Sequence, residues 1–339
     1  MLKKIAGFIF LLGLVVALWL GFELKTSVVN VDKIVTIRLR SNWSMDSLAN
    51  VLENEAGLEN KEGFKTWATR LKYTEVKPCF LDVLPGDDLW SIIKRLKSLR
   101  KQVLMVVINP EFDMDKLIKA VSGKIQVDSA ELAAALSSDS IMGEYGLNKY
   151  NWQVLFIPNS YEFYVSTDLQ GFFAKMKKEQ DLFWTKERLA LAEGLGYTKM
   201  EVVNIASIVT KESHMKNEQT DIAGVYINRL KKGMKLQADP TVNFAKGKGG
   251  RVYYKDLNIQ SAYNTYQNVG LPPGPICIPS PSSIDAVLNY QGHKYLFFCA
   301  KEDFSGYHNF AETYSQHQAN AARWSAALDK EKQDKAELN

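Results

Sequence analysis

The sequence of 339 residues lacks the patterns that mark several common protein classes. It contains no zinc-finger spacing of cysteine and histidine and no glycine loop of the kind that cradles phosphate. Its net charge of +4 is too small to indicate a nucleic-acid-binding protein. His308 and His317 stand apart from each other and from the cysteines, so a metal site is not expected. We therefore predict no nucleic-acid partner, no metal and no cofactor.

Cysteine is also scarce, with only Cys79, Cys277 and Cys299. Their spacing fits no metal site. Outside the cytoplasm one disulfide is possible, and Cys277 with Cys299 is then the favoured pair. Buried free thiols are the preferred alternative, because free cysteine is among the most buried residue types.

The chain begins with the strongest hydrophobic signal in the sequence. Lys3 and Lys4 precede an uncharged run from Ile5 to Phe22, which Glu23 closes. At ~1.5 Å per residue this run reaches roughly 27 Å as a helix, close to the thickness of a bilayer's hydrocarbon core. A cleaved signal peptide is the alternative, but the run is long and ends without a small-x-small cleavage site. We therefore predict an uncleaved anchor in an inner membrane, with the N-terminus cytoplasmic and the remaining chain outside that membrane.

One carboxylate shares the apolar face of a predicted helix. Ile205, Ile208 and Val209 lie seven, four and three residues before Glu212, so helical periodicity places all four on one side. Burial of a carboxylate raises its pKa and keeps a proton available near neutral pH, as a general acid requires. The alternative is a glutamate at the edge of the apolar stripe that reaches out to water. Thr198 is the expected cap of this helix.

Several motifs surround this helix, and a second helical run follows it at residues 221–230. They are Ile157-Pro158-Asn159-Ser160-Tyr161-Glu162-Phe163, Asn228-Arg229-Leu230, Gly233-Met234-Lys235-Leu236-Gln237-Ala238-Asp239-Pro240-Thr241-Val242, Tyr263-Asn264-Thr265-Tyr266 and Gly270-Leu271-Pro272-Pro273-Gly274-Pro275. Together they resemble the MltG (YceG-like) family of endolytic murein transglycosylases. The resemblance extends loosely over the chain beyond the first apolar segment.

This resemblance implies a catalytic glutamate near the end of the helix. The family often has two glutamates flanking the lysine there, but here the first is Thr210, which leaves Glu212. The frequent Arg-Pro after the next glutamate is also absent, because Gln219 and Thr220 follow Glu218. We predict that the substrate contacts come from polar and aromatic residues of the motifs, namely Asn228, Gln237, Asp239, Tyr263, Asn264, Tyr266 and Tyr161. Tyr161 can alternatively pack in the core, which is the commoner fate of an aromatic residue.

The predicted fold class is α+β, in four parts. Residues 1–25 form the cytoplasmic tip and transmembrane anchor, 30–100 a small β-α-α-β domain, 101–195 a connecting strand and helical region, and 196–339 a mixed catalytic domain. The β-α-α-β part resembles the LysM-like domain of the family and is expected either to bind glycan or to act as a spacer. We expect Ser44 and Asp87 to cap helices of this part. Asp113 is the expected cap of the helix that follows it.

The function implied is endolytic cleavage of the MurNAc-GlcNAc bonds of peptidoglycan, leaving 1,6-anhydro-MurNAc ends, with Glu212 as general acid and base. Peptidoglycan strands, the inner membrane and cell-wall synthases are the expected partners. Two alternatives stay open. One is a two-carboxylate murein hydrolase that pairs Glu212 with Asp239. The other is a non-catalytic glycan-binding scaffold.

Overall fold

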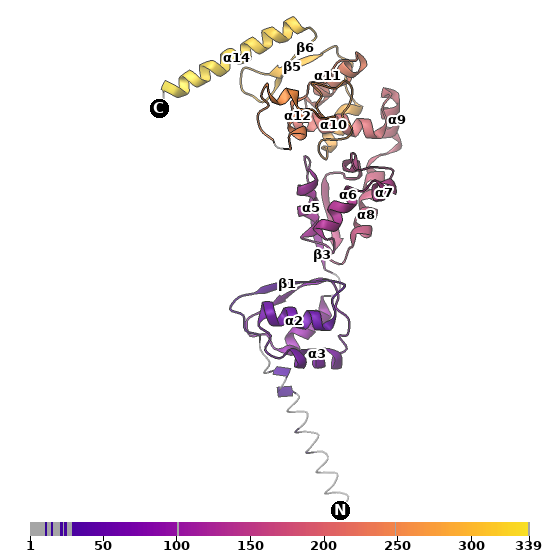
Figure 1. Ribbon diagram of the computed structural model, residues 1–339, viewed down its shortest axis with the longest axis vertical. Helices are drawn as coiled ribbons and strands as arrows, with labels where there is room; N and C mark the ends of the chain where they lie inside the picture. The colour runs from indigo at the N-terminus through magenta and orange to yellow at the C-terminus, as the bar shows by residue number, and fades with distance from the viewer. Residues whose placement is uncertain are drawn as a thin grey trace, which may run out of the picture. The chain divides into compact units, whose positions relative to one another are not determined.

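The computed structural model describes residues 29–99, 102–247 and 249–337, together with isolated positions 11, 15, 21, 22, 24 and 25. It has a mixed α+β fold, as predicted (Figure 1). The described residues fall into two compact units. The first unit runs up to Val106 and includes Ser122–Val127 and Glu162–Leu169, and the second comprises Val107–Val121, Asp128–Tyr161 and the chain from Gln170 onward.

No helix among the described residues is both long and apolar enough to cross a membrane. The predicted anchor, residues 5–22, lies outside the described residues except for four isolated positions. That prediction therefore stays a prediction.

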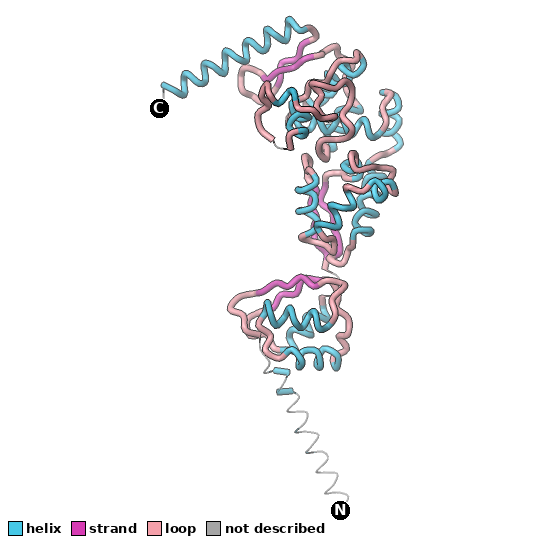
Figure 2. The backbone as a smooth tube through the Cα atoms, in the orientation of Figure 1, coloured by secondary structure: helices cyan, strands magenta, loops and turns pink. Residues whose placement is uncertain are grey.

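The first unit contains the predicted β-α-α-β order. Its two strands pair antiparallel, with Val35 opposite Val83 and Leu39 opposite Cys79. In Figure 2 the strands pass along one side of the helices. The elements are β1 (Val35–Leu39), α2 (Met45–Ala56), α3 (Lys61–Arg70), β2 (Cys79–Val83) and α4 (Leu89–Ser98).

Local signals in the sequence begin and end these helices. Ser44 caps α2, because its side chain accepts the N–H of Ser47. Gly57 ends α2 with a φ of 61°, and a Cβ there would lie 2.8 Å from a backbone oxygen. The prediction of Asp87 as the cap of α4 is wrong by one residue: Asp88 caps it, whereas Asp87 forms an ion pair with Arg95 at 2.6 Å.

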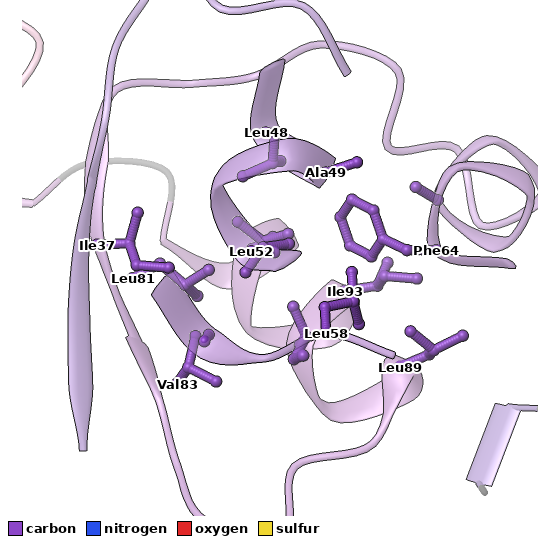
Figure 3. Close-up of a cluster of buried hydrophobic side chains, with 14 of the residues drawn as sticks. Ile37, Leu48, Ala49, Leu52, Leu58, Phe64, Leu81, Val83, Leu89 and Ile93 are labelled. Carbon is purple, nitrogen blue, oxygen red and sulfur yellow. The ribbon is translucent and has the colours of Figure 1, made fainter. Parts of the chain in front are cut away.

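The core of the first unit lies between the strand pair and the helices. Ile37, Leu81 and Val83 point from the strands toward Leu48 and Leu52 of α2 (Figure 3). Alternation along β1 and β2 places one face of each strand in this core, and helical periodicity does the same for α2. Phe64 and Ile93 bring α3 and α4 to the same cluster.

A second strand pair and several helices follow. Strand β3 pairs with β4, which begins directly after Pro158. Asp113 caps α5 as predicted, by accepting the N–H of Lys116. The elements are β3 (Val103–Ile108), α5 (Met114–Ser122), α6 (Ser129–Leu136), α7 (Asp139–Gly143), η1 (Trp152–Leu155), β4 (Asn159–Tyr164), α8 (Leu169–Phe183) and α9 (Lys186–Leu195).

The remainder of the second unit is organised around α10, which packs against α9, α11, α12 and α13. Helix α14 packs against the hairpin of β5 and β6. The elements are α10 (Lys199–Glu212), α11 (Gln219–Lys231), α12 (Asp239–Ala245), η2 (Asp256–Asn258), α13 (Pro281–Leu288), β5 (Phe297–Ala300), β6 (His308–Ala311) and α14 (Tyr314–Glu337). Helix α12 begins at Asp239 and has Pro240 in its first turn, where proline is well tolerated.

All three cysteines are free thiols. Cys79 and Cys277 are buried and Cys299 is partly so. Burial raises the pKa of the Cys277 thiol to about 12, which keeps it protonated. The preferred prediction of free thiols is confirmed for the structure described.

Candidate functional site

Helix α10 carries the candidate acid at its last residue. A capping box begins the helix: Thr198 accepts the N–H of Glu201, and the Glu201 side chain accepts the N–H of Thr198. The helix then runs to Glu212, and Ser213 is its C-cap. Ile205, Ile208 and Val209 are fully buried, which confirms the predicted apolar face.

Glu212 lies in a cavity of about 320 Å³. Its Oε1 accepts a hydrogen bond of 2.5 Å from the Tyr226 hydroxyl of helix α11. The lining comes from six separate stretches of the second unit: Glu212, Tyr226, Arg229, Leu236, Gln237, Asp239, Tyr266, Phe297, Phe298, Tyr314 and His317. The carboxyl group is therefore fixed in direction yet opens onto a space that a ligand can enter.

The surroundings raise the pKa of Glu212 from 4.5 to about 7. Burial is the main cause, because the charged form loses its hydration. The Tyr226 hydrogen bond acts in the opposite direction, since it stabilises the carboxylate. The negative charge of Asp239 raises the pKa further, and the positive charge of Arg229 lowers it. A carboxyl group with a pKa near 7 can both donate and accept a proton near neutral pH.

Asp239 is the second carboxylate of this cavity. It is the first residue of α12, and its Oδ1 accepts a hydrogen bond of 2.7 Å from the Tyr266 hydroxyl. Burial, followed by this hydrogen bond, raises the pKa of Tyr266 far above its ordinary value. Tyr266 therefore stays a donor and holds the Asp239 side chain in place.

Hydrogen bonds between two loops hold this part of the cavity in shape. Gln237 has a φ of 49°, which is rare for a residue other than glycine. Its backbone N–H donates to Thr265 O at 3.1 Å, and the next N–H, that of Ala238, donates to the Thr265 hydroxyl at 3.0 Å. The hydroxyls of Thr241 and Thr265 lie 2.8 Å apart. The strained backbone at Gln237 is thus maintained by bonds on both sides of it.

Arg229 is a buried cation at the edge of the cavity. Its Nε donates to Leu296 O and its Nη1 to Leu236 O, both at 2.7 Å. Its guanidinium group also lies over the Phe297 ring, 5.3 Å from the centroid. Arg229 thereby ties α11 to the Leu236 loop and to the chain entering β5, and its burial lowers its own pKa.

The hairpin and the last helix supply the aromatic wall. Phe297 and Phe298 come from β5, whereas Tyr314 and His317 come from the start of α14. The His317 ring stacks on Phe297 with centroids 5.3 Å apart, and its Nδ1 is buried without a hydrogen-bond partner among the described residues. Burial lowers the pKa of His317, so this imidazole is neutral near pH 7.

Sequence reasoning did not identify Tyr226 or this aromatic wall. Tyr226 sits in an apolar run of α11 that reads as core, and only helix packing brings its hydroxyl to Glu212. The wall comes from a hairpin and a helix about 100 residues further along the chain, and a lone histidine offered no ligand pattern. The concentration of aromatic residues after Tyr295 was the one available signal.

Three of the predicted substrate-binding residues line the Glu212 cavity, namely Gln237, Asp239 and Tyr266. Tyr263 lines a second cavity of about 760 Å³ in the same unit. Their roles toward a ligand stay predictions.

The remaining three predicted substrate-binding residues, Asn264, Asn228 and Tyr161, form hydrogen bonds with the protein's own backbone. Asn264 is 0% exposed; its Nδ2 donates to Leu257 O and Ile259 O, and its Oδ1 accepts the N–H of Tyr266. Asn228 Nδ2 donates to two backbone oxygens near the hairpin. Tyr161 is buried and donates to Ile157 O. In this structure these side chains organise loops, and burial keeps Asn264 and Tyr161 away from a ligand.

The proline turn at residues 270–275 packs against Tyr150 and Gln153, two residues that line the second cavity. Asn204 donates to Pro272 O and Gln153 to Pro275 O. Between them Gly274 packs directly on the backbone of Tyr150, where a Cβ would lie 1.8 Å from the carbonyl oxygen. Glycine is therefore required at this position by close approach.

The chemistry available is that of acids and bases. Among the described residues, no three histidine, cysteine, aspartate or glutamate side chains meet in an arrangement that could hold a metal ion. The Glu212 cavity instead combines one proton donor of raised pKa, a second carboxylate and aromatic faces. Such a set suits cleavage of a bond whose leaving oxygen needs a proton.

Comparison with known proteins agrees with this chemistry. The model of the YceG-like family matches residues 37–323. An endolytic murein transglycosylase of Bacillus subtilis (strain 168) is 27% identical over 300 residues, which cover 84% of this chain and 82% of that protein. One from Streptococcus pneumoniae (strain R6) is 26% identical, and the match covers 86% of this chain but only 59% of that protein. A crystal structure described as that of a YceG-like protein from Listeria monocytogenes has a TM-score of 0.57 at 24% identity, covering 85% of this chain and 99% of that one, and is similar in fold.

Proposed function

We propose that this chain, which belongs to the YceG-like family, is an endolytic peptidoglycan lytic transglycosylase with Glu212 as its general acid and base. The observation that carries the proposal is the Glu212 carboxyl group, which faces a cavity and has its pKa raised to about 7. With a pKa of about 7, a large share of the Glu212 carboxyl groups carries a proton near neutral pH and can give it to a substrate oxygen.

In the first step protonated Glu212 donates its proton to the oxygen that leaves the scissile MurNAc–GlcNAc bond. The resulting carboxylate is stabilised by the Tyr226 hydroxyl, which already donates to Oε1. In the second step this carboxylate removes the proton from the C6 hydroxyl of the muramic acid, and that oxygen bonds to C1. No water is added, and the product carries a 1,6-anhydro end.

The attacking hydroxyl belongs to the same sugar as C1, so no separate nucleophile must be bound and oriented. Asp239 is then free to bind the substrate, since Tyr266 fixes its side chain in the same cavity. Gln237 and Tyr266 line the cavity beside it and are proposed as further substrate contacts.

The test of the acid is the substitution Glu212→Gln, which keeps the shape of the side chain and removes its titratable proton. Purified murein should be cleaved by the wild type and at least ~10²-fold more slowly by the variant. Circular dichroism and a melting curve show whether the variant is folded. A folded variant with full activity would remove Glu212 from the mechanism.

A two-carboxylate hydrolase is the second candidate, because Asp239 lines the same cavity as Glu212. Digestion in water enriched in oxygen-18 distinguishes the two reactions. The lytic reaction leaves anhydro ends that are unlabelled and one water lighter than hydrolytic ends. Label at the new reducing ends would assign Asp239 as catalytic partner, and absence of any turnover would favour a glycan-binding scaffold.

We also propose that residues 5–22 anchor the protein in the bacterial inner membrane, with Lys3 and Lys4 cytoplasmic. A reporter fused after Asn339 should then be active only in forms that work outside the cytoplasm. A mature chain that begins beyond residue 20 would contradict the anchor. In this location cell-wall synthases are the expected protein neighbours.

The β-α-α-β unit of residues 35–96 is proposed to bind glycan as a LysM-like domain. Its core is self-contained within the first unit, so its removal should leave the chemistry of Glu212 intact. Deletion should weaken binding to insoluble murein. Unchanged binding would make the unit a spacer.

A further inference from the structure

We propose that the 760 Å³ cavity is a second glycan subsite, which holds N-acetylhexosamine rings of the strand at a distance from the bond that Glu212 cuts. This inference rests on the proposed function. The predicted substrate residue Tyr263 lies in this cavity rather than beside Glu212. We refer to this cavity as the distal subsite.

The distal subsite and the Glu212 cavity are built on the same two elements. At the end of α10, Lys211 lines the distal subsite and Glu212 lines the other cavity. At the start of α12, Asp239 lines the Glu212 cavity and Pro240 lines the distal subsite. Neighbouring residues thus face neighbouring cavities. A polymer that fills the Glu212 cavity and extends past α12 therefore meets the distal subsite.

Aromatic rings line the distal subsite and are available to a ligand. Phe244 and Tyr263 lie with ring centroids 4.5 Å apart, and Tyr150 stands on the segment before η1. The side chains of Tyr150 and Phe244 are 49% and 37% exposed, although they are large and apolar. Exposed aromatic faces gathered in a concave site are typical of a binding surface. The C–H faces of sugar rings stack on such surfaces.

Two amide side chains in the lining have carbonyl oxygens with nothing to bind. Gln153 is 4% exposed, and its Oε1 is buried without a hydrogen-bond partner among the described residues. Asn243 Oδ1 is likewise buried and has no hydrogen-bond partner among the described residues. A buried acceptor left unpaired is costly, and its presence in a binding site calls for a ligand donor or a bridging water. The N–H of an N-acetyl group and the sugar hydroxyls are such donors.

The charges of the lining favour an uncharged ligand over a stem peptide. The described part of the lining contains three carboxylates and three lysines: Glu111, Asp113, Asp115, Lys116, Lys149 and Lys211. Each lysine already has a carboxylate partner, at 2.8 Å for Lys211 with Glu111, 3.5 Å for Lys149 and 3.8 Å for Lys116. A peptide carboxylate would therefore meet no unpaired cation among the lining residues that the structure describes. Sugar rings need none.

The test is the double variant Tyr150→Ala and Phe244→Ala, made in the full-length chain. Both side chains are exposed, so truncation should leave the fold intact, and a melting curve checks this. Tyr254→Ala is the matched control, because Tyr254 is 91% exposed and is absent from both linings. Binding of peptide-free murein glycan strands is measured by fluorescence anisotropy in the Glu212→Gln background, which prevents cutting during the measurement.

We expect the double variant to bind long strands roughly tenfold more weakly, as truncation of two aromatic contacts implies. Binding of a short oligosaccharide that occupies the Glu212 cavity alone should change less than about twofold, and the control variant should behave as its background does. Equal binding of long strands by the double variant would overturn the distal subsite. A loss seen only with strands that carry stem peptides would also overturn it, in favour of a peptide site.

These binding measurements, taken together with the digestion of murein by the wild type, separate this inference from the proposed function. If the wild type fails to cut murein but the double variant still loses affinity for long strands, the enzyme proposal falls and the subsite stands. If the wild type cuts murein and the double variant binds long strands as its Glu212→Gln background does, the subsite alone falls.

Discussion

Replacement of Tyr226 by phenylalanine tests the origin of the raised pKa of Glu212. The Tyr226 hydroxyl donates to Oε1 at 2.5 Å and stabilises the carboxylate, so it holds the pKa of Glu212 below the value that burial alone would give. Phenylalanine keeps the ring that packs edge-on against Phe298 and removes only this donor. The pKa of Glu212 should therefore rise above about 7.

The size of the change follows from the strength of the lost bond. A hydrogen bond to a charged group contributes ~1.5–3 kcal/mol, and ~1.4 kcal/mol corresponds to one pH unit. A water entering the vacated space would replace part of the bond, so we expect a rise of about one pH unit. Because cleavage requires protonated Glu212, the alkaline limb of the pH profile of kcat/KM should move upward by that amount. Activity at pH 8, relative to the plateau, should increase roughly fivefold.

The control is Asp239→Asn, which should shift the pKa of Glu212 in the opposite direction. The negative charge of Asp239 raises the pKa of Glu212, so its removal should move the alkaline limb downward. Both profiles are measured on murein digestion with folding checked at each pH. A limb that stays in place in both variants, or moves down in Tyr226→Phe, would refute the account of the Glu212 environment.

Further predictions concern stability. The folded-state pKa of Glu212, about 7, exceeds its ordinary value of 4.5, so the folded protein holds this proton more tightly and loses stability as pH rises through that window. Glu212→Gln should therefore stabilise the protein increasingly between pH 4.5 and 7, by up to about 3 kcal/mol above pH 7, and a constant difference in denaturant unfolding across this range would contradict the burial. Gly274→Ala places a Cβ 1.8 Å from Tyr150 O and should cost about 1–3 kcal/mol, whereas Gly143→Ala, which meets open space, should not lower the melting temperature. Asn264→Ala removes two hydrogen bonds to the backbone oxygens of Leu257 and Ile259 and should lower stability by about 1–3 kcal/mol in the same assay.

The parts of the fold that were predictable are those set by local sequence. Helix periodicity placed Glu212 on one face with Ile205, Ile208 and Val209, and the sequence identified Thr198 as the N-cap of the same helix. The shared face and the cap could both be predicted because each depends only on residues within two or three helical turns. Asp239 shows the limit of such reasoning. Its Asp-Pro pair is compatible with a turn and with the first turn of a helix, and only the packing of α12 against α10 decides between them.

The cavity itself could be predicted only in part. The resemblance pointed to Gln237, Asp239 and Tyr266, which line it, but also to Asn264, whose amide is used within its own loop. The direction of a short amide depends on the loop path, which the sequence does not specify. Tyr226 and His317 reach the cavity through the packing of α11 and α14, and no spacing in the sequence encodes that meeting.

The position of Glu212 as the last residue of α10 has a consequence for its chemistry. The aligned peptide dipoles of a helix place roughly half an elementary negative charge at its C-terminus, where the last carbonyl groups lack partners within the helix. A carboxylate at that end is opposed by the backbone itself, whichever side chains surround it, and its neutral form is favoured. The same potential would favour the positive charge that develops on a sugar ring as its glycosidic bond breaks. The direction of the α10 backbone therefore favours the protonated form of Glu212 and a positively charged sugar ring in this cavity. Substitutions in the lining can change the size of this backbone effect but cannot remove it.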